Sequence, residues 1–238
     1  MSGKSQSVEH QFGGETLLSE LVRATKPRAT IILFPTVAGV SELELGFART
    51  LAGNGFNAFV ADLYGKEFRG SGREMGAQQM QRLRSSRATL GNRLLAVVET
   101  VRGLQDTGAG IVAIGFCFGG LCALDLARTG IDIAGVASFH GLFDPTGLAP
   151  RPIKAKVIAF HGWDDPLVPP AKVVALGAEL TSAGCDWQIH AFGNTVHAFT
   201  NPGADKFGNP ATRFSPDANR RSWRALDGFL DDLFPANG

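Results

Sequence analysis

The sequence predicts an α/β fold: a mostly parallel sheet with an antiparallel start at the N-terminus and helices on both faces. Short apolar runs alternate with helical patterns along most of the 238 residues, as parallel strands joined by crossover helices do. At the start, two short extended runs flank Gly13-Gly14, which indicates a β-hairpin. The length, with 44% hydrophobic and 19% charged residues, suits one α/β domain over residues 1–238.

Each element has its own signal in the sequence. Apolar or β-branched runs predict the strands, and amphipathic periodicity predicts the helices. After the hairpin (Ser7–Phe12 and Glu15–Ala24), the expected strands are Thr30–Phe34, Phe56–Ala61, the run from Ile111 into Gly115, Ile133–Phe139, Lys156–Phe160 and Asp186–Phe192. The expected helices are one capped by Ser41 and Glu44 that reaches about Ala52, one long helix over about Gln78–Leu104, and Leu121–Arg128, Ala171–Ala183 and Ala218–Phe234. A long loop, Gly193–Asp217, precedes the last helix.

Charge and composition argue against several classes of partner. The net charge is +1 and the basic residues are scattered, which speaks against nucleic acid as the main partner. Only Gln78–Arg93 is rich in arginine, and its helical spacing predicts a solvated face formed by Arg82, Arg84, Arg87 and Arg93.

The chain carries no signal for a membrane or for secretion. No apolar run approaches the roughly 18 residues of a membrane span, and the N-terminus lacks the apolar core of a signal peptide. The three cysteines are odd in number and lack the spacing of metal ligands. We therefore expect a cytoplasmic protein with free thiols and no cofactor or metal, acting as a monomer or homodimer.

The most informative stretch is Gly115-Phe116-Cys117-Phe118-Gly119, at the junction of a predicted strand and a predicted helix. A strand that turns into a helix through G-x-nucleophile-x-G forms a nucleophile elbow, here with cysteine where serine is more usual. Glycine is needed because a Cβ beside the strained turn would collide with the neighbouring strand or helix. A buried structural cysteine or a phosphate-binding loop is the alternative, but the stretch lacks G-x-x-x-x-G-K-[ST].

An elbow of this kind requires a carboxylate and then a histidine further along the chain. Asp164 and Asp165 follow the predicted strand that ends in His161-Gly162. Asp164 could cap the turn, and Asp165 is the better candidate for the residue that orients a catalytic histidine.

His197 follows the last predicted strand, in the position that the order Cys, Asp, His demands. His140 and His161 stand at strand ends, where they could line the site or cap backbone carbonyls. His10 and His190 have no such context.

Together these motifs resemble the dienelactone hydrolase (carboxymethylenebutenolidase) family of α/β-hydrolases. The resemblance covers nearly the whole chain and is carried by Ala61-Asp-Leu-Tyr-Gly65, Ile114-Gly-Phe-Cys-Phe-Gly-Gly120, Ser138-Phe-His-Gly141, Asp164-Asp-Pro-Leu-Val-Pro169 and Val196-His-Ala-Phe-Thr-Asn-Pro202. It implies an α/β-hydrolase fold, a Cys117–His197–Asp165 triad, and an oxyanion hole formed by the backbone N–H groups of Phe118 and Val37. We also expect Thr36, His140 and Trp163, each just after a predicted strand, to line the substrate site.

Two positions depart from the family pattern. Thr36 stands where the resemblance implies a glutamate close to the nucleophile, so the thiolate should depend on His197 and on the helix that follows the elbow. Asn201 stands four residues after His197, and the arginines that bind the substrate carboxylate in dienelactone-specific members are not recognisable. We therefore expect a small neutral ester or lactone as substrate. An organophosphate triester is the alternative substrate, and a catalytically silent binding protein is the alternative class.

Overall fold

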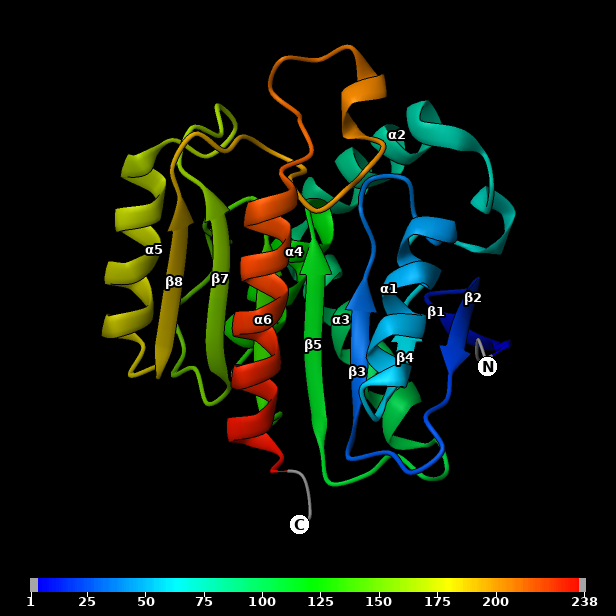
Figure 1. The fold of residues 1–238 in the computed structure, drawn as a ribbon. Helices are drawn as coiled ribbons and strands as arrows, with labels where there is room; N and C mark the ends of the chain where they lie inside the picture. Colours follow the sequence, from blue (N-terminus) through cyan, green and yellow to red (C-terminus); the bar gives the residue numbers. More distant parts are fainter. Residues whose placement is uncertain (1–3, 236–238) are drawn as a thin grey trace.

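The structure is a computed structural model that describes residues 4–235 (Figure 1). Its eight strands form one sheet in the order β1-β2-β4-β3-β5-β6-β7-β8. The strands are β1 (Ser5–Phe12), β2 (Glu15–Val22), β3 (Ala29–Phe34), β4 (Phe56–Val60), β5 (Ile111–Phe116), β6 (Gly135–Phe139), β7 (Lys156–Gly162) and β8 (Trp187–Phe192). The pairs β1–β2 and β2–β4 are antiparallel and all the others are parallel. The predicted fold class, with its antiparallel start, is confirmed.

Helices cover both faces of the sheet (Figure 1). Apolar residues of α1 (Glu42–Gly53) and α6 (Pro216–Leu233) pack on one face. Those of α3 (Arg87–Arg102), α4 (Phe118–Arg128) and α5 (Pro170–Ser182) pack on the other. The remaining helical segments are α2 (Gly72–Arg84) and the short 3-10 turns η1 (Lys66–Phe68) and η2 (Ala204–Phe207). None of the helices in the described range 4–235 combines the length and the apolar character that crossing a bilayer requires.

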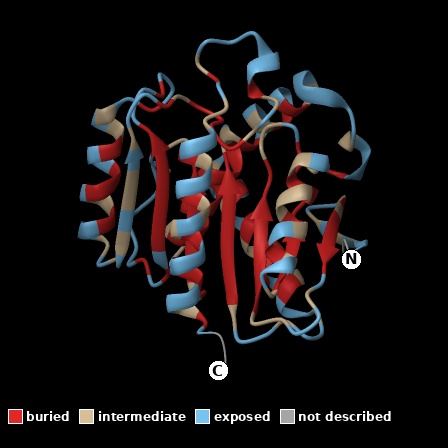
Figure 2. Ribbon diagram, in the orientation of Figure 1, coloured by how far each residue is buried: buried red, intermediate tan, exposed pale blue. Residues whose placement is uncertain are grey.

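The burial of the strands follows their apolar runs. Every residue of β3 and β5 is buried, and Figure 2 shows these central strands in red. The edge strand β8 has only intermediate and exposed residues, as expected for a strand with a neighbour on one side only. Both layers of helices therefore pack against fully buried central strands. The Cys117 turn lies at the end of one of them, β5.

The single long helix predicted over Gln78–Leu104 is wrong, because the structure has two helices there, α2 and α3. The break falls at Ser85 and Ser86, and Ser86 has φ −134° and ψ 86°, outside the helical region. The Ser85 hydroxyl donates a hydrogen bond to the Arg82 carbonyl at 2.7 Å. Serine side chains compete in this way with the helical hydrogen bonds of the backbone. The apolar periodicity runs through the break, so the pattern alone did not reveal it.

The predicted solvated arginine face is also wrong. Arg93 is only 2% exposed, and it donates a hydrogen bond to the Leu63 carbonyl at 2.8 Å and pairs with Glu15. Arg82 pairs with the other oxygen of Glu15 at 2.7 Å. A carboxylate from the N-terminal hairpin therefore pairs with both arginines; Arg93 can be buried because its charge is paired, whereas Arg82 stays exposed.

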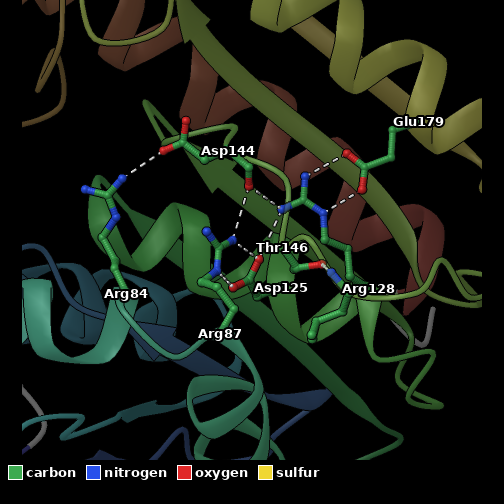
Figure 3. A network of polar contacts seen from close by, with 8 residues as sticks. Arg84, Arg87, Asp125, Arg128, Asp144, Thr146 and Glu179 are labelled. Atoms are coloured by element: carbon green, nitrogen blue, oxygen red, sulfur yellow. Dashed lines mark hydrogen bonds and ion pairs between the residues drawn. The ribbon is translucent and has the colours of Figure 1, made fainter.

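The next arginines belong to a second network on the same face of the sheet (Figure 3). Asp125 of α4 is 3% exposed and accepts hydrogen bonds from Arg87 at 2.7 Å and from Arg128 at 3.1 Å. Arg128 also forms two parallel hydrogen bonds with Glu179 of α5, at 2.7 and 2.8 Å. Arg84 and Lys172 pair with Asp144. The network therefore ties α3, α4 and α5 together.

Candidate active site

Cys117 lies on the sharp turn between β5 and α4 and has φ 56°. Residues other than glycine rarely adopt positive φ, so the turn is strained. A Cβ on Gly115 would lie 1.8 Å from the carbonyl oxygen of Gly119, and one on Gly119 would lie 2.1 Å from that of Phe34. Both glycines of the motif are therefore required by close backbone contacts, and the structure has the strand–turn–helix shape expected of a nucleophile elbow.

His197 and Asp165 lie side by side at the same edge of the sheet, beyond the carboxyl ends of the strands. Nδ1 of His197 is 2.7 Å from Oδ2 of Asp165, and the two residues are 3% and 1% exposed. The other carboxylate oxygen of Asp165 accepts a hydrogen bond from the backbone N–H of Leu167 at 2.9 Å. The carboxylate is therefore fixed on one side by the chain and faces the imidazole on the other.

The neighbouring Asp164 has a different role. Its Oδ2 accepts a hydrogen bond from the backbone N–H of Thr195 at 3.2 Å, and Asp164 itself is exposed. Of the two adjacent carboxylates, only Asp165 is brought to His197. Asp164 makes the turn-stabilising contact that the sequence offered as the alternative.

The Cys117 thiol and the His197 imidazole are close enough to shift each other's protonation. Burial raises the pKa of the Cys117 thiol, but His197, together with the backbone N–H groups of Phe118 and Val37, lowers it by more, so that the pKa is lowered overall. Burial lowers the pKa of His197, whereas Cys117 and Asp165 raise it to about 10. These opposite shifts favour a thiolate–imidazolium pair at neutral pH.

Two backbone N–H groups also act on the sulfur. Those of Phe118 and Val37 lower the pKa of Cys117 further. Phe118 is the first residue of α4, and Val37 follows β3 in the neighbouring loop. The structure thus brings the two predicted oxyanion-hole residues to the Cys117 sulfur from different elements. Nε2 of His197 is buried and makes no hydrogen bond of ordinary geometry within the described residues.

The other two histidines at strand ends are buried behind this group. His140 is 1% exposed, its Nε2 lies 2.8 Å from Oγ1 of Thr200, and burial and the neighbouring His197 hold its pKa well below the usual value. His161 is fully buried against Phe143. His140 therefore packs against the candidate triad, and its contact with substrate stays a prediction.

Thr36 and Trp163 lie at the same edge of the sheet as the candidate triad. Thr36 precedes Val37 and is partly exposed, and Trp163 is 43% exposed. Their contact with substrate also stays a prediction. A cavity of about 960 Å³ lies elsewhere, between α3, the C-terminal end of α4 and residues 145–153, and none of the predicted site residues lines it.

The sequence did not reveal two residues that hold the loop after β3. Glu44 is fully buried and its carboxylate accepts hydrogen bonds from the backbone N–H and the hydroxyl of Thr36, at 3.0 and 2.8 Å. The Tyr64 hydroxyl donates to the Val37 carbonyl at 3.3 Å. The capping pattern correctly predicted that a helix begins after Ser41. The sequence signal for the further role of Glu44 was Thr36, which lies a few residues upstream and has an N–H and a hydroxyl that both need an acceptor.

Comparisons with known proteins agree with this geometry. A dienelactone hydrolase-like promiscuous phosphotriesterase from metagenomic libraries has a solved structure with 30% sequence identity and a TM-score of 0.87, covering 98% of this chain and 100% of that one. An uncharacterized protein of Caenorhabditis elegans is 34% identical over 125 residues, which are 51% of this chain and 79% of that protein. The dienelactone hydrolase of Anabaena variabilis, at 18% identity and a TM-score of 0.67 over 98% of both chains, shares the fold. The model of the Dienelactone hydrolase family matches residues 17–234, and the chain therefore belongs to this family of α/β-hydrolases.

Proposed function

We propose that this protein hydrolyses carboxylic esters and lactones, with Cys117 as nucleophile, His197 as general base and acid, and Asp165 as the residue that orients His197. One observation carries the proposal: Asp165 holds Nδ1 of His197 at 2.7 Å while the same imidazole lowers the pKa of the Cys117 thiol. Membership of a hydrolase family supports the reaction class. The arrangement matches the general pattern of a nucleophile activated by a base that a third group orients.

In the acylation step, the Cys117 thiolate attacks the substrate carbonyl carbon and an S–C bond forms. The carbonyl π electrons move to oxygen, and the N–H groups of Val37 and Phe118 stabilise the resulting oxyanion. Each donor of this kind is typically worth roughly 10²–10³ in rate. The intermediate then collapses, the C–O bond to the leaving group breaks, and the His197 imidazolium gives its proton to the departing oxygen. A thioester to Cys117 remains.

In the deacylation step, neutral His197 accepts a proton from water as the water oxygen attacks the thioester. The second tetrahedral intermediate expels the Cys117 thiolate and releases the carboxylic acid, while His197 keeps the proton. The thiolate–imidazolium pair is thereby restored. The sum is hydrolysis of one ester bond by one water molecule, with no other reactant.

Aryl esters with a chromogenic leaving group test the proposal directly. Cys117→Ala and His197→Ala should each lower kcat by at least about 10³-fold, because the triad acts as a unit. Cys185→Ala is the matched control, since Cys185 lies near Asp186 and Ala155, away from the elbow, and should keep full activity. Full activity in either triad variant would sink the mechanism.

Selective alkylation separates an enzyme from a silent binding protein of the same fold. Burial raises the pKa of Cys185 to about 11 and holds that of Cys122 well above its usual value. Iodoacetamide at neutral pH should therefore label Cys117 first, because only the thiolate reacts. Equal labelling of the three cysteines, together with no turnover on a broad ester panel, would favour the binding protein.

Phosphotriesters are the second candidate substrates. A relative with 30% identity is described as a promiscuous phosphotriesterase, and Thr36 places a small, uncharged side chain next to the oxyanion loop. A thiolate can attack phosphorus as well as carbonyl carbon. Thr36→Glu should change the ratio of aryl-ester to phosphotriester activity, and an unchanged ratio would count against this candidate.

A further inference from the structure

A buried carboxylate of α1 binds the loop after β3, and its hydrogen-bond partners among residues 4–235 all belong to the segment between β3 and α1. Oε1 of Glu44 accepts hydrogen bonds from the backbone N–H and the hydroxyl of Thr36, at 3.0 and 2.8 Å. Oε2 accepts one from the Ser41 hydroxyl at 2.5 Å. Glu44 is fully buried in the first turn of α1. A buried carboxylate is stable only when such donors are present, so this one fixes the start of the loop against the helix.

The next peptide group is held by the loop's own backbone. The Thr36 carbonyl accepts a hydrogen bond from the N–H of Gly39 at 3.0 Å, and Gly39 has φ +73°. The Thr36 hydroxyl also accepts one from the N–H of Ala38 at 3.3 Å. In a trans peptide the carbonyl and the following N–H point in opposite directions. The Thr36 carbonyl therefore turns toward Gly39, and the Val37 N–H turns the other way.

The far side of the loop is packed equally closely. The Tyr64 hydroxyl donates to the Val37 carbonyl at 3.3 Å, and a Cβ on Gly76 of α2 would lie 2.1 Å from that same oxygen. Val37 is thus fixed by Thr36 before it and by Tyr64 and Gly76 at its own carbonyl.

Among residues 36–39 of the loop, one N–H group has no oxygen partner within the described residues. The N–H groups of Thr36, Ala38 and Gly39 are all engaged within the loop or by Glu44. That of Val37 makes no hydrogen bond to another backbone or side-chain oxygen among residues 4–235, and it acts on the Cys117 sulfur. Within residues 36–39 the other N–H groups are therefore occupied, and the Val37 N–H is the one left to act on the Cys117 sulfur.

We propose that Glu44 is a positioning residue that holds the Thr36–Val37 peptide so that the Val37 N–H points into the oxyanion hole. This inference rests on the proposed function. The Glu44 carboxylate never meets the substrate, and it acts through the Thr36 N–H and hydroxyl that it binds. Hydrogen-bond donors of an oxyanion hole must point at the oxyanion position before the reaction begins. They stabilise the transition state because no free energy is then spent on reorienting them.

Glu44→Gln tests the inference, with Glu42→Gln as the matched control in the same helical turn. The Glu42 side chain is 82% exposed and pairs only with Arg49. Glu44→Gln leaves a single, uncharged acceptor oxygen for the three donors that Glu44 binds (the Thr36 N–H, the Thr36 hydroxyl and the Ser41 hydroxyl), and its NH₂ group cannot accept. We expect kcat on an aryl ester to fall by about 10–100-fold with little change in KM, because the lost interaction forms in the transition state. Glu42→Gln should match the wild type.

The pH profile of Cys117 alkylation supplies the second readout. Iodoacetamide reacts at a saturated carbon and needs no oxyanion hole, so its limiting rate at high pH should stay unchanged in Glu44→Gln. The apparent pKa of that alkylation should rise, because the Val37 N–H no longer favours the thiolate. A role of Glu44 in stability alone would lower the melting temperature and move neither readout.

The outcomes distinguish this inference from the proposed function. Wild-type protein without Cys117-dependent turnover defeats the proposed function, and the alkylation pKa then still tests the position of the Val37 N–H. Wild-type kcat together with an unchanged alkylation pKa in both folded Glu44→Gln and Thr36→Val overturns the inference. If Glu44→Gln does not fold, Thr36→Val removes the hydroxyl that links Glu44 to Ala38 at nearly constant volume. It should move both readouts in the same direction by a smaller factor, and wild-type values for both would overturn the inference.

Discussion

The imidazole rings of His140 and His197 meet edge to face, with centroids 5.0 Å apart and planes at 66°. His197 carries the proton, with a pKa raised to about 10, and His140 is held neutral by burial and by the neighbouring charge. A second proton beside His197 would therefore be costly. The pair therefore makes the folded state less stable relative to the unfolded state at acidic pH.

The first prediction concerns the stability of this pair against pH. Below pH 6.5 the unfolded chain protonates His140 while the folded chain does not, so the unfolded state gains and stability falls as the pH falls. In His140→Gln that loss is removed. Between pH 7 and pH 5 the free energy of unfolding in urea should fall by about 1–2 kcal/mol less in the variant than in the wild type. Equal pH dependence in both proteins would contradict the assignment of a neutral His140.

The second prediction contrasts two adjacent carboxylates. Asp165→Asn should lower kcat on aryl esters by about 10³–10⁴-fold, because an amide neither fixes the imidazole tautomer nor stabilises its charge. Asp164→Asn should keep most of the activity, since its side-chain oxygen can still accept the hydrogen bond from Thr195. Steady-state kinetics of the two variants checks this, and comparable losses in both would argue against the choice of Asp165.

The third prediction uses two glycines in different surroundings. Gly115→Ala should destabilise the protein by about 2–4 kcal/mol, because its Cβ would lie 1.8 Å from the Gly119 carbonyl oxygen and backbone atoms cannot move aside. Gly228→Ala, in the middle of α6 with nothing within 4 Å of the new methyl group, should stabilise it by about 0.5–1 kcal/mol. Urea unfolding of both variants measures the difference, and a harmless Gly115→Ala would refute the tight elbow.

The fourth prediction concerns the buried ion-pair network (Figure 3). Asp125→Ala should destabilise the protein by about 3–5 kcal/mol, because it leaves Arg87 and Arg128 with one fewer buried partner each. Glu99→Ala removes the exposed partner of Arg102 on the same face and should cost less than about 1 kcal/mol. Chemical unfolding compares the two, and similar small losses would show that the network contributes little.

Much of the fold and of the candidate site followed from local patterns. The strands could be predicted because short, continuous apolar runs between turn residues are typical of buried strands. Cys117, Asp165 and His197 could be grouped without coordinates, because each follows a strand of a parallel sheet and such strand ends share one edge. The elbow glycines marked Cys117 as the candidate nucleophile, because a Cβ on Gly115 or Gly119 would collide with backbone atoms.

Other features depend on side-chain contacts that a sequence pattern does not reveal, either because the partners are distant in sequence or because the side chain points away from its usual partner. Arg93 is buried because of Glu15, 78 residues away, and no helical period contains that information. The break between α2 and α3 depends on serine hydrogen bonds inside a continuous apolar pattern. Glu44 looked like an ordinary capping residue, and its contact with Thr36 became visible only when the loop was folded.

The order of the three proposed catalytic groups along the chain has a consequence for protein synthesis. A chain that emerges from its N-terminus contains Cys117 long before Asp165 and His197 are available. During that interval the thiol lacks His197, which lowers its pKa in the folded protein. Cys117 therefore reacts as an ordinary thiol until the segment beyond β8 has folded against β5. A late histidine thus protects the growing chain from its own reactive thiol.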